Sequence, residues 1–183
     1  MNTKCKVFAI VSNLTIIITS SVSIIGVPSS AFAQQLQQMQ QEQRHKFTAI
    51  LTGSEEVPPK SNIKATGAAE FLPSINRTML DYTVNTTNLD NVTTGHIHLG
   101  KTGENGPVLV TLFESATPFV LRAIGGWYLV AQGNLTSSDL QGPLASKQIS
   151  DLVNIMKNVQ AYVDLHTYQN PDGEVRGQII SGT

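Results

Sequence analysis

The sequence predicts an all-β fold, an antiparallel sandwich or barrel of about eight strands with one or two short helices. From Lys46 onward, short runs of alternating apolar and polar residues are separated by Gly, Pro, Asn and Asp. These runs recur at the spacing of a strand plus a turn, and little helical pattern lies between them. Strands this short and numerous are typical of antiparallel sandwiches and barrels.

The eight expected strands follow one another along the chain with turn-forming residues between them. In the first, Phe47, Ala49 and Leu51 alternate with more polar positions, as in a strand that buries one face. The connection at 101–107, "KTGENGP", contains Gly103 and Gly106, which permit positive φ in a tight turn. The expected strands lie within residues 46–53, 65–72, 78–86, 93–100, 107–113, 127–135, 161–168 and 173–181.

Two helical signals interrupt the strands. At 134–140, Thr136 or Ser137 can cap a helix whose first turn contains Asp139. Further on, a longer helix is expected from about Ser146, because its apolar residues recur at helical spacing. These apolar residues are Ile149, Leu152, Val153 and Met156.

Residues 1–33 are typical of a secretory signal peptide. Two lysines precede a long apolar stretch, and "AFA" at 31–33 predicts cleavage before Gln34. The alternative is an uncleaved membrane anchor, since the stretch is long enough to span a bilayer. Cys5, the single cysteine, lies in this segment, so the remaining chain offers no thiolate ligand and no disulfide. Either alternative places the rest of the chain at the cell exterior or in the extracellular space.

Residues 34–45 form a glutamine-rich spacer, and residues 46–183 form the β domain. Seven of the twelve spacer residues are glutamine, a polar composition that cannot bury enough surface to fold alone. Removal of the signal takes away Lys4 and Lys6, which leaves ten basic and 13 acidic residues and a formal charge of −3. No basic cluster follows the signal, so nucleic acid is not expected as a partner. A membrane is a partner only if the signal is retained.

Three histidines form a candidate metal site for copper or zinc. His96 and His98 stand two residues apart in an expected strand, so their side chains share one face. In the expected strand 161–168, His166 and Asp164 share a face in the same way. If the two strands are neighbours, three imidazoles and one carboxylate converge, a plausible ligand set for either metal.

The alternative is a polar network that holds loops without any metal. Glu174 and Arg176 share a strand face, and Glu55 or Glu56 can receive Arg176 in a bidentate ion pair. In such a network the histidines donate and accept hydrogen bonds as part of the scaffold. The residues alone leave both alternatives open, so no cofactor is assigned with certainty.

Other chemistry is weakly represented in the sequence. No Gly-x-Ser-x-Gly elbow and no Ser–His–Asp arrangement are evident, so no catalytic residue is predicted. Four Asn-x-Ser/Thr sequons make the protein a candidate glycoprotein. The sequon asparagines are Asn76, Asn85, Asn91 and Asn134.

Three segments together resemble one family, the CHRD domain named after chordin. The segments are "LTGSEEVPP" (51–59), "GHIHLGKTGENGPVLVTLF" (95–113) and "AYVDLHTYQNPDGEVRGQI" (161–179), with "GNLTSSDL" (133–140) between the second and third. The resemblance covers about residues 46–181. The chain departs from the family at Asp164, where the family more often has Asn, and this adds a carboxylate near the third histidine.

The resemblance implies a secreted, all-β, immunoglobulin-like Greek-key domain, here a single-domain prokaryotic member. The family has no established biochemical activity, so it implies location and fold more than chemistry. The expected function is therefore a secreted extracellular module with a non-enzymatic binding or structural role, whose partner is an extracellular protein or a cell-surface component. The alternative function is a secreted copper- or zinc-binding protein, in redox chemistry or metal handling, that uses His96, His98 and His166.

Overall fold

The structure is a computed structural model that describes residues 30, 33–34, 45–115, 122–124 and 127–182. The predicted signal peptide with Cys5, and nearly all of the glutamine-rich spacer, lie outside these residues and stay predictions. Among the described residues, none of the helices combines the length and apolar character that a membrane crossing requires.

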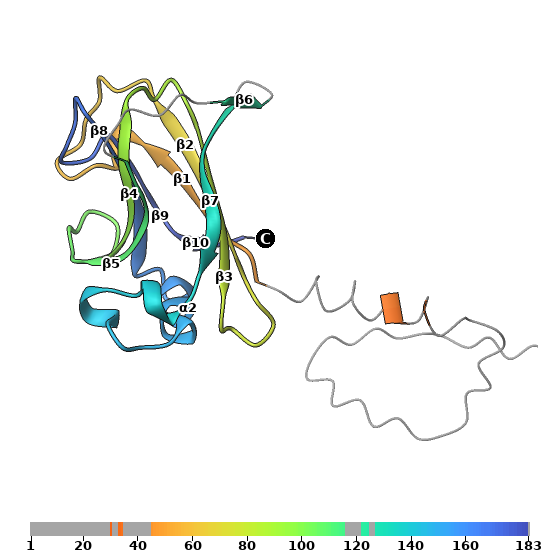
Figure 1. Ribbon diagram of the computed structural model, residues 1–183. Coiled ribbons are helices and arrows are strands. Elements are labelled where there is room, and N and C mark those ends of the chain that lie inside the picture. Colours follow the sequence, from red (N-terminus) through yellow and green to blue (C-terminus); the bar gives the residue numbers. More distant parts are fainter. Residues whose placement is uncertain (1–29, 31–32, 35–44, 116–121, 125–126, 183) are drawn as a thin grey trace, which may run out of the picture. The chain divides into compact units, whose positions relative to one another are not determined.

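The described strands pair antiparallel in one ten-stranded sheet, in the order β5-β4-β8-β9-β1-β2-β3-β7-β6, with β10 also paired to β1. The sheet curls into a nearly closed barrel (Figure 1). The strands are β1 (Phe47–Thr52), β2 (Thr66–Pro73), β3 (Leu80–Thr87), β4 (Val92–Leu99), β5 (Val108–Glu114), β6 (Arg122–Ile124), β7 (Trp127–Leu135), β8 (Ala161–Thr167), β9 (Val175–Gln178) and β10 (Ile180–Ser181).

The predicted all-β fold is confirmed. Each of the eight expected runs contains a strand, and the last run divides into β9 and β10. β6, which pairs with β7, was not expected from the sequence. Its three residues are too few to show a period of two, so no pattern could have revealed it.

Alternation along the strands forms the core of the barrel. In β1, Phe47, Ala49 and Leu51 are buried while Ile50 is exposed, which confirms the predicted face. Across the interior, the Tyr82 hydroxyl of β3 donates a hydrogen bond of 2.5 Å to the Leu112 carbonyl of β5. This bond joins two parts of the curled sheet that are not paired with each other, so the buried hydroxyl is satisfied.

Short helical segments lie in the connections between strands. α2 (Ile149–Lys157) buries the four expected apolar residues, and it lies at one end of the sheet in Figure 1. It begins three residues after the expected start, because the Asp151 carboxylate accepts a hydrogen bond of 2.9 Å from the Gln148 N–H and caps the helix there. The remaining helical turns are η1 (Gly53–Glu55), η2 (Ser137–Asp139) and η3 (Gly142–Leu144).

Three loops come together over the outer face of β4, β8 and β9: the 53–65 loop, the 100–107 loop and the 168–174 loop. The Lys60 ammonium donates to the Gly173 carbonyl, which joins the first loop to the third. The Asn105 amide donates at 3.0 Å to the Val57 carbonyl, which joins the second to the first. A Cβ at Gly106 would lie 1.7 Å from the Leu99 carbonyl oxygen, so only glycine allows this close return of the 100–107 loop.

Candidate metal centre

Three histidines lie on one face of the neighbouring strands β4 and β8. Thr94 of β4 lies directly opposite His166 of β8, and His96 lies opposite Asp164. Because side chains two residues apart share a face, His98 points to the same side as His96. The strand register therefore brings the three imidazoles together, as their spacing predicted.

These three residues form the histidine triad. One ring nitrogen from each lies within 4.8 Å of the others, and His96 Nδ1 is 3.1 Å from His166 Nε2. Nitrogens bound tetrahedrally at 2.0–2.1 Å to one zinc ion stand roughly 3.3 Å apart. Small rotations of the rings would therefore bring all three nitrogens to the distance of common ligands. Each imidazole is half-buried.

Two backbone carbonyls fix which nitrogen carries the proton. His98 Nδ1 lies 2.9 Å from the Gly106 carbonyl oxygen, and His166 Nδ1 lies 2.9 Å from the Pro171 carbonyl oxygen. Since a carbonyl can only accept, both Nδ1 atoms carry the hydrogen, and both Nε2 atoms keep a lone pair. This is how metal-binding imidazoles are commonly held by a carbonyl behind them.

All three imidazoles are neutral at pH 7. Burial lowers the pKa of His96 to about 4, with His166 and His98 adding to the effect. Burial also lowers the pKa of His98 and of His166, although the carbonyl behind each ring partly opposes this. Neutral imidazoles are the form that binds metal, so no proton has to be displaced at neutral pH.

Asp164 does not join the triad, although the sequence predicted it as a further ligand. It lies opposite His96 in the register, but the group of ligand atoms within 4.8 Å contains the three histidines only. Its carboxyl is instead hydrogen-bonded with Glu56 of the 53–65 loop. The loop that covers this face thus supplies a second carboxyl group, and one oxygen of each group, Asp164 Oδ1 and Glu56 Oε1, is buried without a partner among the described residues.

Asp164 and Glu56 form a buried carboxyl pair. Burial, with a smaller contribution from the Glu56 charge, raises the pKa of Asp164 to about 8 against the opposing effect of Arg176. Burial likewise raises the pKa of Glu56, while the nearby Lys60 ammonium acts in the opposite direction. A Cβ at Gly173 would lie 2.7 Å from Asp164 Oδ1 and 2.8 Å from Glu56 Oε2, so only glycine lets the 168–174 loop pass this close.

Arg176 is buried under the 100–107 loop. Its Nη1 donates to Asn105 Oδ1 at 2.8 Å, and its Nη2 donates to the carbonyls of Glu104 at 2.6 Å and Lys101 at 3.2 Å. The guanidinium carbon lies 3.4 Å from the centre of the Tyr162 ring, a cation–π contact. Only 2 % of the residue is exposed, so these contacts hold a charged group away from water.

The expected ion pair between Arg176 and a glutamate is not formed. Glu55 is exposed, Glu56 pairs with Asp164, and Glu174 accepts hydrogen bonds close to its own loop, one of them from Asn170 at 3.0 Å. The physical reason is the fold of the 100–107 loop, which turns two carbonyls and an amide oxygen towards the guanidinium, so that Nη1 and Nη2 donate to these groups instead of a carboxylate.

Sequence reasoning gave no role to the residue beside the triad, Tyr162. Its ring stacks on His98, with the centroids 5.0 Å apart and an angle of 8° between the planes. Its hydroxyl accepts a hydrogen bond of 3.2 Å from the Gly106 N–H. The available signal was its position two residues before Asp164 and four before His166, on the face already assigned to the site.

Of the four sequon asparagines, Asn76 and Asn91 lie in loops, whereas Asn85 and Asn134 lie in β3 and β7. Asn76 and Asn134 are exposed, while Asn85 and Asn91 are half-buried. Asn91 adopts φ +54°, in the turn before β4. Glycosylation itself stays a prediction.

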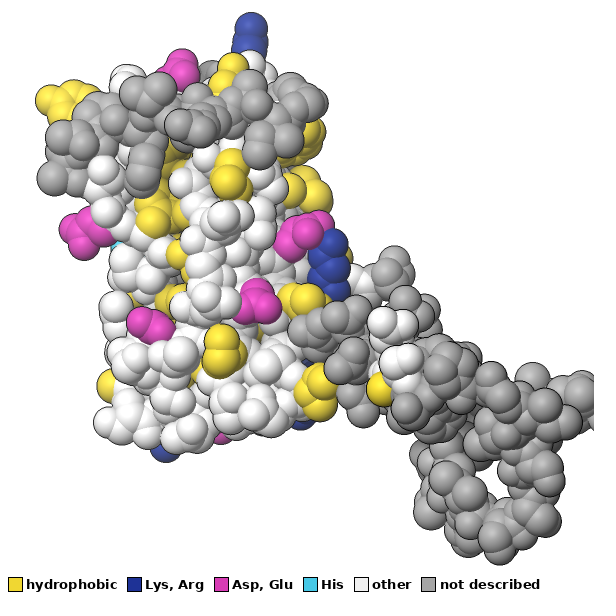
Figure 2. Space-filling view, turned by 45° about the vertical axis from the view of Figure 1, so that its right-hand side comes forward, with side chains coloured by type: hydrophobic (Ala, Val, Ile, Leu, Met, Phe, Trp, Pro, Cys, Tyr) yellow, Lys and Arg dark blue, Asp and Glu magenta, His cyan; other side chains and the backbone are white. Residues whose placement is uncertain are grey.

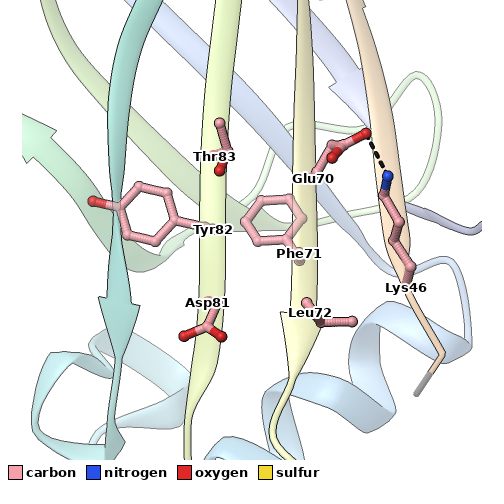
Figure 3. A pocket seen from close by; sticks show the side chains of 7 residues that line it. All are labelled: Lys46, Glu70, Phe71, Leu72, Asp81, Tyr82 and Thr83. Atoms are coloured by element: carbon pink, nitrogen blue, oxygen red, sulfur yellow. Dashed lines mark hydrogen bonds and ion pairs between the residues drawn. The ribbon is translucent and has the colours of Figure 1, made fainter. Parts of the chain in front are cut away.

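A pocket elsewhere on the sheet lacks comparable chemistry. It lies along β1, β2 and β3, and Figure 3 shows the ion pair of Lys46 and Glu70 beside the rings of Phe71 and Tyr82. Charged side chains on the face in Figure 2 are dispersed among uncharged ones. The ion pair is half-exposed, so the pocket offers no buried reactive group.

The CHRD domain family model matches residues 47–179, which is most of the chain. Comparison with curated proteins and with solved structures gives no match. The matched range begins at the first strand of the barrel and ends directly after β9, so it includes the triad, the carboxyl pair and Arg176. The chain belongs to the CHRD domain family, a family of extracellular-type modules.

Proposed function

We propose that this domain binds one copper or zinc ion through His96, His98 and His166, outside the cytoplasm. The observation that carries the proposal is the His98 Nε2 atom, which is buried and has no hydrogen-bond partner among the described residues. A buried nitrogen left without a partner costs free energy, about 1–3 kcal/mol. A metal ion between the three rings would satisfy it.

A hydrogen-bond network alone accounts less well for the triad. If His96 Nδ1 carries a hydrogen, it donates to the lone pair of His166 Nε2, and two of the three imidazoles are paired. The third, His98, already donates its only hydrogen to the Gly106 carbonyl. The network therefore leaves one lone pair unused, whereas a shared ion uses all three.

The triad leaves a coordination position open. Asp164 is engaged with Glu56, so the described residues supply three ligand atoms and no fourth. The half-buried rings allow water or a small ligand to reach an ion held between them. Three protein ligands with an open fourth position are typical of zinc sites that act on a ligand rather than sites that only stabilise a fold.

The proposed extracellular location is supported by the predicted signal peptide and by the family. A basic start, an apolar stretch and "AFA" support export of the chain, and the CHRD family is of extracellular type. In that setting the sequons, two of them on exposed asparagines, are accessible to a glycosylating host. If no metal binds, recognition of an extracellular protein or cell-surface component becomes the working function.

Metal content tests the proposal directly. The protein is purified without a histidine tag or chelator, incubated with copper or zinc, desalted and measured by elemental mass spectrometry. We expect about one ion per chain, and loss of that ion in His98→Ala, because three ligands are the minimum for a stable site of this type. His45→Ala is the matched control, since His45 lies before β1 and outside the triad.

Two results would count against metal binding. One is wild-type protein that retains neither metal; the other is metal that persists unchanged in His98→Ala and is lost in His45→Ala. Because burial lowers the pKa of all three histidines, that of His96 to about 4, retention of the ion should also persist at pH 6, where an ordinary histidine is mostly protonated.

A further inference from the structure

A stack of three side chains extends from the triad into the protein. Tyr162 of β8 lies between β4, which carries His98, and β9, which carries Arg176. The tyrosine ring is nearly parallel to the His98 ring, and the guanidinium carbon lies 3.4 Å from its centre. A positive charge is thus placed one aromatic ring away from a candidate metal ligand.

The charge of Arg176 is not neutralised by an ion pair. Its donors all go to uncharged oxygens, those of Asn105, Lys101 and Glu104, the last two through backbone carbonyls. Among the described residues no carboxylate lies within 4 Å of the guanidinium, although its charge also acts on the more distant carboxyl groups of Glu56 and Asp164. In a buried site such a charge acts over several ångströms, because little water screens it.

The triad itself brings no negative charge. Its three imidazoles are neutral, and the nearest carboxyl group in the register, Asp164, shares a hydrogen bond with Glu56 instead of facing the rings. The stack places the guanidinium charge one aromatic ring away from His98. The Arg176 guanidinium therefore repels every positive charge that is added at the triad.

We infer that the triad prefers monovalent over divalent copper, and that Arg176, acting through the Tyr162 stack, sets this preference. The inference rests on the proposed function and deepens it. Divalent copper has one more positive charge than monovalent copper at the same place, so the guanidinium repels it more strongly. Across the two stacked rings between the guanidinium and the bound ion, one unit charge changes the ratio of the affinities for the two copper ions about tenfold.

Arg176 is also a positioning residue for His98. It holds the carbonyls of Lys101 and Glu104, and the same loop presents the Gly106 carbonyl to His98 Nδ1. Loss of that support weakens binding of both copper ions alike. Loss of the charge, in contrast, changes the ratio of the two affinities, and this separates the two roles.

The test measures the dissociation constants of both copper ions by competition with chelators of known affinity, in the full chain. Arg176→Gln removes the charge and Arg176→Lys keeps it. We expect Arg176→Gln to move the affinity ratio about tenfold towards divalent copper. Arg176→Lys is expected to weaken the binding of both copper ions, while the ratio of the two affinities stays near that of the wild type.

A second pair of variants avoids any dependence on the folding of the Arg176 variants. Asn105→Asp places a carboxylate on the atom that already accepts from Nη1, so it neutralises the guanidinium in place. Asn105→Ala, its control, removes the contact without adding charge. We expect the ratio to move towards divalent copper in Asn105→Asp and to remain near the wild-type value in Asn105→Ala.

The outcomes separate this inference from the proposed function. Copper binding with an unchanged ratio in both Arg176→Gln and Asn105→Asp overturns the inference and leaves the metal site intact. Zinc binding without copper binding does the same. Wild-type protein that binds neither metal overturns both. A wild type that binds divalent copper more tightly than monovalent copper also contradicts the inferred preference.

Discussion

The two faces of β8 are both buried, but they are buried in different ways. On the inner face, Ala161, Val163 and Leu165 pack into the core of the barrel with no exposed surface. On the outer face, Tyr162 and Asp164 are buried beneath loops and beside charged groups. The apolar face needs only neighbours of suitable size, whereas the polar face needs a partner for each donor and acceptor.

The difference between the two faces of β8 shows that the site depends on the loops that cover the polar face. A strand with alternating apolar and polar residues normally leaves its polar face in water. Here the 53–65, 100–107 and 168–174 loops cover that face, and their backbone carbonyls replace water as partners of His98 Nδ1 and His166 Nδ1. The loops therefore convert an ordinary strand surface into a place where histidines stay neutral.

The largest expected effect comes from the apolar face. Leu165→Ala removes a side chain with no exposed surface, and such deletions lower the free energy of unfolding by about 2–5 kcal/mol. Denaturant unfolding of the metal-free protein measures this change. A loss below about 1 kcal/mol would mean that the inner face is loosely packed, and the comparison between the faces would fail.

The buried carboxyl groups of the polar face should instead make the stability of the protein depend on pH. Since the pKa of Asp164 is about 8 in the folded protein and 3.8 is its ordinary value, the folded state holds a proton that the unfolded state has released. Its stabilising effect is therefore largest at low pH and is lost as pH rises towards 8. Between pH 6.5 and 8 we expect the metal-free protein to lose on the order of 1 kcal/mol relative to a variant in which residue 164 cannot ionise.

Asp164→Asn is the matched variant for this pH dependence. It keeps the shape of the side chain and removes its ionisation. The three histidines, whose pKa values are lowered in the folded state, make stability rise with pH in wild type and variant alike, so the difference between the two slopes isolates Asp164. Thermal unfolding at several pH values measures this dependence. If stability changes equally with pH in wild type and variant, the buried carboxyl pair is contradicted.

The smallest effect is expected at an exposed polar contact. Lys46 and Glu70 form an ion pair of 2.5 Å whose side chains are 46 % and 51 % exposed. Exposed pairs contribute about 0.2–1 kcal/mol, so Glu70→Gln should change the free energy of unfolding by no more than this. A change as large as that of Leu165→Ala would remove the distinction between buried and exposed polar groups.

Much of the inner face could be predicted from the sequence, and part of the outer face. Alternation placed eight strands and the apolar residues of α2, because burial of one face leaves a period that the sequence records. The i, i+2 spacing of His96 and His98, with His166 on a second strand, brought the triad together correctly. These features depend on local spacing and on which strands are neighbours.

The partners of the outer face could not be predicted in the same way. Arg176 was expected to pair with a glutamate, yet it donates to backbone carbonyls, which every residue offers without any sign in the sequence. Asp164 was expected at the metal site, but a carboxyl from the 53–65 loop holds it elsewhere. Which partner each of these side chains binds depends on the conformation of the loops, and the spacing of residues in the sequence does not predict it.

The triad joins two strands that are distant in sequence, since His96 and His166 are 70 residues apart. With a single cysteine, the chain cannot form an internal disulfide. An ion held by these histidines would act as a removable cross-link across β4 and β8, bridging a long segment much as a disulfide closes a loop. Chelation would open that cross-link without breaking a covalent bond, so the rigidity of this part of the barrel would follow the supply of metal around it.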